Sequence, residues 1–141
     1  MFKKKDIEII KEYEYMFDHY FKKEIPFYPI KFGFECNNGW FGIIEKLISD
    51  INKIDIDNKI IVEQIKEKFG GLRFYYTFNG DSDISKKIYD LVTIAESVSY
   101  KTCENCGCQE DITCKSRMDG LVLYVNLALK KINKGRYIWL Q

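Results

Sequence analysis

The chain has almost no histidine, no long apolar run and almost no net charge. His19 is the only histidine among 141 residues, and the sequence offers it no recognisable partner for general-base catalysis. No apolar stretch approaches the roughly 20 residues of a membrane-spanning helix, and the charged N-terminus lacks the apolar region of a secretory signal. We therefore expect a cytoplasmic protein that is not associated with a membrane.

The charge balance excludes several classes of protein. Lys plus Arg number 22 and Asp plus Glu number 21, which leaves a net charge of +1. An acidic mimic of nucleic acid would be more negative, and a protein that follows phosphate backbones would be more positive. Gly70 and Gly71 lack the surrounding residues of a phosphate-binding loop. Because no acid, base and nucleophile are grouped in the sequence either, we expect a binding protein and not an enzyme.

Apolar periodicity predicts three helices in a single domain that spans residues 1–141. Hydrophobic residues make up 46% of the chain, which is enough to bury a core. Residues 6–23 have the pattern of an amphipathic helix with Asp6 as its N-cap. The other helices are expected over residues 40–53 and, after a capping turn at 79–83, over residues 83–100. Their predicted buried stripes are Phe41, Ile44, Leu47, Ile48 and Ile51, and then Ile84, Ile88, Leu91, Ala95 and Val98.

Residues 72–78 are the clearest strand in the chain, because apolar and polar side chains alternate there. The preceding residues 60–69 fit two structures, either a helix that ends at Gly70 or the first arm of a hairpin. The hairpin is favoured because a turn at positions 70 and 71 gives one uniformly polar face. On that face Lys68 is opposite Arg73, Lys66 is opposite Tyr75 and Gln64 is opposite Thr77. The unfavourable feature is that Glu63 and Glu67 fall on the apolar face.

These elements predict an α+β fold in which helices pack on a small antiparallel sheet, with a cysteine knuckle at residues 102–120. Two candidate contact surfaces accompany the fold. The first surface, which we call the basic strip, has the composition of a site for single-stranded nucleic acid. A sheet face that is simply exposed to solvent has the same composition. The basic strip consists of Lys66, Lys68, Arg73 and Tyr75. The aromatic loop either contacts a partner or folds back on the core. It contains Phe27, Tyr28, Phe32 and Phe34.

Four of the five cysteines lie within twelve residues. Cys103 and Cys106 have the C-x2-C spacing of half a tetrahedral zinc site, and Cys108 and Cys114 follow closely. In a reducing compartment, clustered thiols bind metal more often than they form disulfides. The four are therefore candidate ligands of one structural zinc ion, and the alternative is a turn whose thiols are free or packed. Cys36 stands alone and is expected to be a small buried hydrophobic residue.

Four short motifs occur between residues 39 and 126. They are GW at 39–40, IKEKFGGLRFYY at 65–76, AESVS at 95–99 and TCENCG at 102–107. Together they resemble a family of small proteins found in bacteriophages and bacterial genomes. The resemblance implies a zinc ribbon, made of the cysteine knuckle, a Gly-Trp strand and a second pair of ligands. This chain has Leu121 in place of that Trp and has Asn126 and Leu129 near the second pair, so the ribbon is degenerate. Either Cys108 and Cys114 replace the missing ligands or the metal has been lost.

The resemblance implies an association with mobile genetic elements and no particular catalytic activity. Combined with the charge-balanced, compact composition, it leads us to expect a non-enzymatic accessory protein, encoded by a phage or mobile element, that binds a host protein. Inhibition of a bacterial defence nuclease, such as a CRISPR effector, is one such role. The alternative is a module that binds single-stranded nucleic acid through the basic strip.

Overall fold

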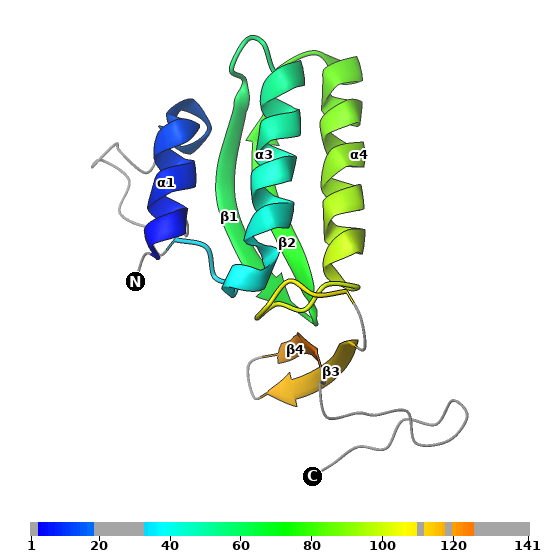
Figure 1. Cartoon of the computed structure of the whole chain (residues 1–141). Helices are drawn as coiled ribbons and strands as arrows, with labels where there is room; N and C mark the ends of the chain where they lie inside the picture. The colour runs from blue at the N-terminus through cyan, green and yellow to red at the C-terminus, as the bar shows by residue number, and fades with distance from the viewer. Residues whose placement is uncertain (1–2, 19–32, 110–111, 118–119, 126–141) are drawn as a thin grey trace.

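The fold is built around an antiparallel hairpin of strands β1 (Ile60–Lys68) and β2 (Gly71–Phe78). The computed structural model describes residues 3–18, 33–109, 112–117 and 120–125. Helices α3 and α4 lie side by side over one face of the hairpin, and α1 lies beside β1 (Figure 1). The predicted α+β fold is confirmed. The elements besides the hairpin are α1 (Lys4–Glu12), η1 (Glu14–Phe17), η3 (Asn38–Trp40), α3 (Phe41–Ile54), α4 (Ser82–Ser99), β3 (Ile112–Arg117) and β4 (Gly120–Val125).

A bulge at Glu63 explains how β1 keeps an apolar face. The pairing register shifts at this residue, so Glu63 and the next residue both fall on the outer face. Ile60, Val62 and Ile65 are thereby all buried, although their spacing is not that of a regular strand. The Glu63 carboxylate accepts a hydrogen bond from the Thr77 hydroxyl on the outer face. The bulge thus moves a charge that simple alternation would have placed on the apolar side.

The hairpin turns at Phe69 and Gly70, one residue earlier than the predicted turn. Both residues have positive φ, 55° and 80°, which matches the twist of a two-residue hairpin turn. The predicted partners are therefore wrong by two positions: Lys68 pairs with Gly71, Lys66 with Arg73 and Gln64 with Tyr75. Because the shift is even, these residues keep their predicted face. Glu67 remains on the inner side at the end of the hairpin, half-buried, and its carboxylate accepts the Gly70 N–H at 2.7 Å.

Helix α3 buries the stripe that the sequence predicts. Its five apolar contact residues are at most 3% exposed: Phe41, Ile44, Leu47, Ile48 and Ile51. The helix ends at Asp55, whose carboxylate accepts the N–H groups of Lys59 and Ile60, both at 2.9 Å. These two hydrogen bonds hold the connection from α3 into β1.

Helix α4 begins at the predicted capping turn but buries a different stripe. The Asp81 carboxylate accepts the N–H of Asp83 at 2.8 Å and that of Ile84 at 3.4 Å. The buried residues are Ile88, Val92, Ala95 and Ser99. The predicted core residues Ile84, Leu91 and Val98 are only partly buried. The apolar stripe of α4 is therefore wider than the face that packs on the hairpin.

The N-terminal helix differs from the prediction at both ends. It begins two residues earlier than expected and changes into a 3-10 turn after Tyr13. Asp6, the predicted N-cap, instead lies in the first turn and is fully buried. Its carboxylate accepts the Lys3 N–H at 3.1 Å and the Phe34 N–H at 3.3 Å. Asp6 thus ties a distant segment to the start of α1, a long-range role that local pattern does not reveal.

Strands β3 and β4 form a second antiparallel hairpin after residues 103–108, with Arg117 paired to Gly120. Strand β4 contains the apolar residues from Leu121 to Val125. Among the helices that the structure describes, none combines the length and apolar character needed to cross a membrane.

Candidate functional site

The cysteine turn, residues 103–108, is closed by its own backbone. The Cys103 N–H donates to the Cys108 carbonyl, and the Gly107 N–H donates to the Cys103 carbonyl, both at 2.8 Å. Gly107 has a φ of 77°, a conformation that glycine adopts readily and other residues rarely do. The turn therefore has a fixed shape that follows from the position of this glycine.

The cysteine turn docks on the residues around Trp40. The Gly39 N–H donates to the Glu104 carbonyl at 2.7 Å, and the Trp40 indole donates to the Thr102 carbonyl at 2.8 Å. A Cβ on Gly39 would lie 2.2 Å from the Cys103 carbonyl oxygen and 2.5 Å from that of Glu104. Trp40 is itself fully buried. The Gly-Trp pair and the cysteine turn, which are far apart in sequence, thus form one structural unit.

Three of the four predicted zinc ligands have described side chains. Cys103 is buried, whereas Cys106 and Cys108 are exposed. The Sγ atoms of Cys106 and Cys108 are 3.1 Å apart. No group of three or more His, Cys, Asp or Glu residues that could hold a metal is found in the part of the chain that the structure describes. Cys114 lies in β3, and its side chain is outside that part, so the four-thiolate zinc site stays a prediction.

Cys36 is a buried residue of the apolar core, as predicted. Its side chain is 5% exposed, and burial raises the pKa of its thiol to about 12 despite the opposing charge of Lys3. The Lys3 ammonium donates a hydrogen bond to the Cys36 carbonyl. The thiol therefore stays protonated at neutral pH and is not a nucleophile.

The structure brings most of the basic strip together on the outer face of the β1–β2 hairpin. Lys66 lies directly opposite Arg73, and the Lys66 Nζ is 5.2 Å from the centroid of the Tyr75 ring. Lys68 lies nearer the turn, where its Nζ is 5.3 Å from the centroid of the exposed Phe69 ring. Phe69 was not a predicted site residue, because its exposure follows from the position of the turn.

Arg73 is held by its own chain. Its Nη2 donates to the Tyr100 hydroxyl at 2.6 Å, its Nη1 donates to the Leu72 carbonyl at 2.8 Å, and Glu96 Oε2 lies 3.8 Å away. The hydrogen bond with Tyr100 is the main reason that the pKa of Arg73 is raised. Arg73 thus links β2 to α4. Sequence reasoning missed Glu96 and Tyr100, whose only signal is their i, i+4 spacing on one face of the helix.

Part of each edge of the β1–β2 hairpin is covered. On the β2 side, the Ser99 Oγ accepts the Leu72 N–H at 2.8 Å and the Glu96 Oε1 accepts the Phe74 N–H at 3.1 Å. On the β1 side, Glu35 forms a parallel bridge with the strand. Recognition of an extended peptide by strand addition needs an open edge, so these contacts disfavour that mode of binding.

Acidic side chains lie among the basic residues of the outer sheet face. Glu63 projects there at the bulge, and Glu35 accepts a hydrogen bond from the Gln64 amide at 2.7 Å. These carboxylates offset the charges of Lys66 and Arg73. The face is therefore a weaker attractor of phosphate groups than the sequence alone suggests.

Phe34 is the one member of the aromatic loop whose position is described, and it belongs to the core. Its side chain is 3% exposed. Its ring lies 6.2 Å from that of Phe17 and 5.9 Å from that of Phe41, measured between centroids. The ring is consequently not available to a partner. The other predicted contact residues lie outside the described residues: Phe27, Tyr28 and Phe32.

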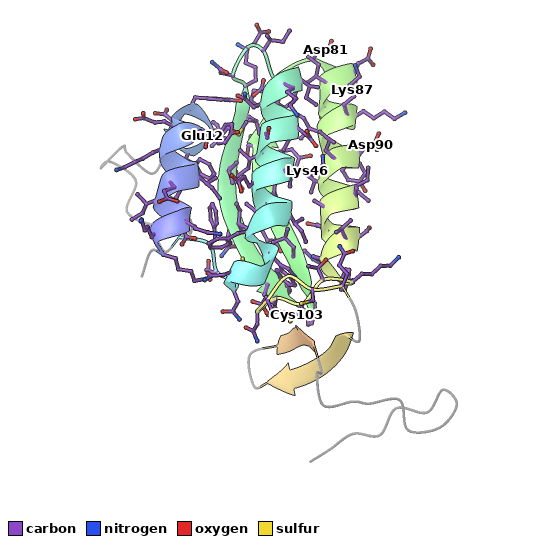
Figure 2. All side chains as sticks on the ribbon, viewed as in Figure 1. Glu12, Lys46, Asp81, Lys87, Asp90 and Cys103 are labelled. Carbon is purple, nitrogen blue, oxygen red and sulfur yellow. The ribbon has the colours of Figure 1, made fainter. Side chains whose placement is uncertain are left out.

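A groove of about 330 Å³ lies between α3 and α4. The rim side chains Lys46 and Asp50 belong to α3, and Figure 2 shows Lys46 between the two helices. Ile94 is 61% exposed, which is unusual for a large aliphatic side chain in a cluster of others. The apolar residues that line the groove are Ile43, Leu47, Leu91, Ile94, Ala95 and Val98.

The groove results from the width of the apolar stripe on α4. Sequence reasoning assigned Leu91 and Val98 to the core, but the structure places them on the wall of the groove. The signal that could have found the groove is Ile94, which lies between them and widens the stripe beyond one contact face. An apolar stripe of this width can pack on more than one neighbouring element. Helix α3 and the hairpin cover only part of the stripe on α4.

No family model, curated protein or solved structure matches the chain. The resemblance to phage and bacterial proteins therefore remains an expectation from four short motifs. Those motifs do contact one another in pairs: GW with the cysteine turn, and the second arm of the hairpin with AESVS. A function has to be argued from the groove, the outer sheet face and the exposed thiols.

Proposed function

We propose that this chain is a protein-binding module that holds an amphipathic helix of a partner in the groove between α3 and α4. The observation that supports the proposal is the groove itself, with about 330 Å³ of space and apolar walls from two helices. Apolar surface is stabilised when a partner removes it from water. Such a role requires no catalytic group, in agreement with the binding function expected from the sequence.

The dimensions of the groove favour a helix as its occupant. Its walls run along α3 from Gly42 to Asp50 and along α4 from Leu91 to Val98. At 1.5 Å per residue these walls are about 12 Å and about 10 Å long, or roughly two helical turns. A partner helix can lie against both walls and complete a layer of three helices, with apolar residues at i, i+3, i+4 and i+7 in contact.

Gly42 leaves room for the backbone of such a helix at one end of the groove. A Cβ at this position would have no atom within 4 Å, so no neighbour requires a glycine here. Within a helix, glycine is roughly 1 kcal/mol less favourable than alanine. Close approach of a second backbone is a physical reason for accepting this loss of stability.

The two charged side chains that line the groove, Lys46 and Asp50, balance each other. The Asp50 carboxylate accepts hydrogen bonds from the Lys46 ammonium at 2.5 Å and from the Lys53 ammonium at 2.8 Å. Hydrogen bonds from these lysines hold the pKa of Asp50 below its usual range, so Asp50 is ionised and offsets the charge of Lys46, while Lys53 lies outside the lining of the groove. The lining therefore favours an occupant through apolar contact and not through net charge.

We also propose that the partner is a bacterial host protein. The support is the resemblance to proteins of bacteriophages and bacterial genomes, which implies that a mobile element encodes the chain. A defence nuclease such as a CRISPR effector is one candidate, because an accessory protein can inhibit such an enzyme by covering a surface that it needs. The chain would then act by binding alone, in the cytoplasm of the host cell.

Binding of single-stranded nucleic acid by the outer sheet face is the alternative. Lys66 and Tyr75 place a cation beside an exposed ring on that face, as a stacking platform requires. The alternative has less support, because Arg73 is held by Tyr100 and Glu96 and because the Glu63 carboxylate lies on the same sheet face. It predicts retention on single-stranded DNA that salt weakens and Lys66→Ala reduces.

Photo-crosslinking of the full chain in bacterial cells tests the groove. A photoreactive phenylalanine analogue replaces Ile94 or, as a control, Tyr89, which is on the same helix, similarly exposed (61% and 63%) and not part of the groove. We expect a crosslinked partner at position 94 only, attached through the apolar stripe of a helix. Ile94→Asp should weaken the isolated complex by about 10-fold or more, because burying an isoleucine contributes roughly 2 kcal/mol. Tyr89→Asp should bind like the wild type.

Three results would contradict this proposal. Equal crosslinking at both positions would show that the groove is not the contact surface. Crosslinks at position 94 between two copies of this chain would assign the groove to self-association. Crosslinks to nucleic acid, together with salt-sensitive retention on single-stranded DNA, would favour the outer sheet face.

A further inference from the structure

The cysteine turn brings two exposed thiols into contact. Cys106 and Cys108 are separated by a single residue, and an extended backbone would hold their side chains roughly 6.6 Å apart, at 3.3 Å per residue. Their Sγ atoms are instead 3.1 Å apart. The positive φ of Gly107, 77°, folds the chain between them. The turn therefore brings the two side chains near enough for their sulfur atoms to be in contact.

The core holds this arrangement in place. A Cβ on Gly107 would lie 2.9 Å from the carbonyl oxygen of Gly39, so another residue at 107 would push the turn away from its support. The hydrogen bonds that close the turn run between Cys103 and its two partners, Cys108 and Gly107. The two thiols are thus presented on a rigid base, which lowers the entropy lost when they react with each other.

The separation of the two sulfur atoms suits reaction between them. It lies between an S–S bond, about 2.05 Å, and the separation of about 3.8 Å that two thiolates have around a tetrahedral zinc ion with Zn–S bonds of about 2.3 Å. Cys103 differs from the pair because its side chain is buried. In the described part of the chain, no third potential ligand completes a metal-binding group with Cys106 and Cys108.

We propose that Cys106 and Cys108 form a redox-active dithiol that exchanges with the disulfides of small thiols such as glutathione. The Sγ atoms of Cys106 and Cys108 are in contact, so once one of the two thiols has reacted, the other is placed to resolve the mixed disulfide. Cys108 attacks one sulfur of the small disulfide, the S–S bond breaks, and one small thiol leaves. Cys106 then loses its proton and attacks the Cys108 sulfur, which forms the internal disulfide and releases the second small thiol. The protein loses two electrons and two protons, and the small disulfide gains them.

The internal disulfide would be easy to reduce. Closing a bond between residues i and i+2 gives a small ring, which restricts the geometry that the S–S bond can adopt. Strained, exposed disulfides are the labile ones, so the pair would be reduced when thiols are abundant and oxidised when they are depleted. A zinc ion on these two sulfur atoms and a disulfide between them are mutually exclusive states.

Oxidised glutathione is the probe for this proposal. The full-length protein is incubated with an excess of it, the remaining thiols are alkylated, and the peptides are analysed by mass spectrometry. We expect the wild type to contain a Cys106–Cys108 disulfide without bound glutathione, while Cys36 stays a thiol. Cys106→Ser should stop at glutathione attached to Cys108, because the sulfur that releases it is missing. Dithiothreitol should reverse both products.

Other products would overturn the proposal. Glutathione that stays on the wild-type protein would show that the two thiols do not resolve each other, and a disulfide from either of them to Cys103 or Cys114 would assign another pairing. A stoichiometric metal ion that blocks oxidation until a chelator removes it would make the thiols ligands. Circular dichroism verifies that Cys106→Ser is folded. The groove is tested separately, since Ile94→Asp should oxidise at the wild-type rate.

Discussion

Gly39→Ala should strongly destabilise the protein, because the cysteine turn packs directly against this position. The added Cβ would lie 2.2 Å from the Cys103 carbonyl oxygen and 2.5 Å from the Glu104 carbonyl oxygen. Both are backbone atoms of a closed turn, so neither can rotate away as a side chain would. The Gly39 N–H also donates to the Glu104 carbonyl at 2.7 Å, and relief of the clash would break this hydrogen bond.

The magnitude follows from these two effects. Overpacking of a tight site costs about 1–3 kcal/mol, and loss of a buried hydrogen bond costs about 1 kcal/mol more. We therefore expect Gly39→Ala to lower the free energy of unfolding by about 3 kcal/mol. For a domain of this size, roughly 3 °C of Tm correspond to each kcal/mol, so the melting temperature should fall by about 10 °C.

Gly42→Ala is the matched control, three residues further along the chain. Nothing lies within 4 Å of its added Cβ, and alanine favours the helix, so this variant should gain about 0.5 kcal/mol. Urea unfolding followed by tryptophan fluorescence measures both variants against the wild type. If Gly39→Ala and Gly42→Ala have the same stability, the docking of the cysteine turn on the Gly-Trp pair is refuted.

Two further predictions concern the covered edge of β2 and the buried thiol. Ser99→Ala removes the acceptor of the buried Leu72 N–H and should lower the free energy of unfolding by about 1–3 kcal/mol. The control Ser97→Ala, at an exposed site on the same helix, should change it by less than about 0.5 kcal/mol. Equal effects of the two variants in thermal unfolding would refute this role of Ser99. The pKa of Cys36 is raised from 9.0 to about 12 in the folded protein, so above pH 9 the unfolded chain releases this proton first. Stability should then fall by up to about 1.4 kcal/mol per pH unit in that window and be unaffected below it. Tyr15, whose pKa burial raises to about 12, acts in the same direction. Cys36→Ala should flatten the measured slope, and an unchanged slope would contradict the assignment.

Elements with strong periodicity could be predicted from the sequence. The stripe of α3 and the capping turn before α4 follow from local rules, because burial on one side repeats with the helix period and Asp81 accepts nearby N–H groups. The hairpin could be predicted for a related reason: its second arm alternates regularly. In each case the decisive interactions are between residues close in sequence.

Features that depend on distant contacts could not be predicted. The bulge at Glu63 corrects a conflict between charge and alternation, but alternation alone does not say which residue is extruded. The buried Asp6 is satisfied in part by the Phe34 N–H, and Ser99 by that of Leu72. For the groove, the sequence gives the width of the apolar stripe on α4 but not which parts of it have neighbours.

The placement of the four sequence motifs bears on how far the resemblance can inform function. The motifs meet where the cysteine turn packs against the hairpin and α3. The contacts there are structural and involve the glycines of the motifs, Trp40, Ser99 and Cys103. Most residues of the groove lie outside the motifs: Ala95 is the first residue of AESVS, Val98 is its fourth, and the others belong to none of them. A chain with the same motifs and a charged side chain at the exposed position 94 would therefore keep this fold and lose the apolar character of the groove. The motifs predict the scaffold, and the partner has to be sought from the face of α3 and α4 that they leave unspecified.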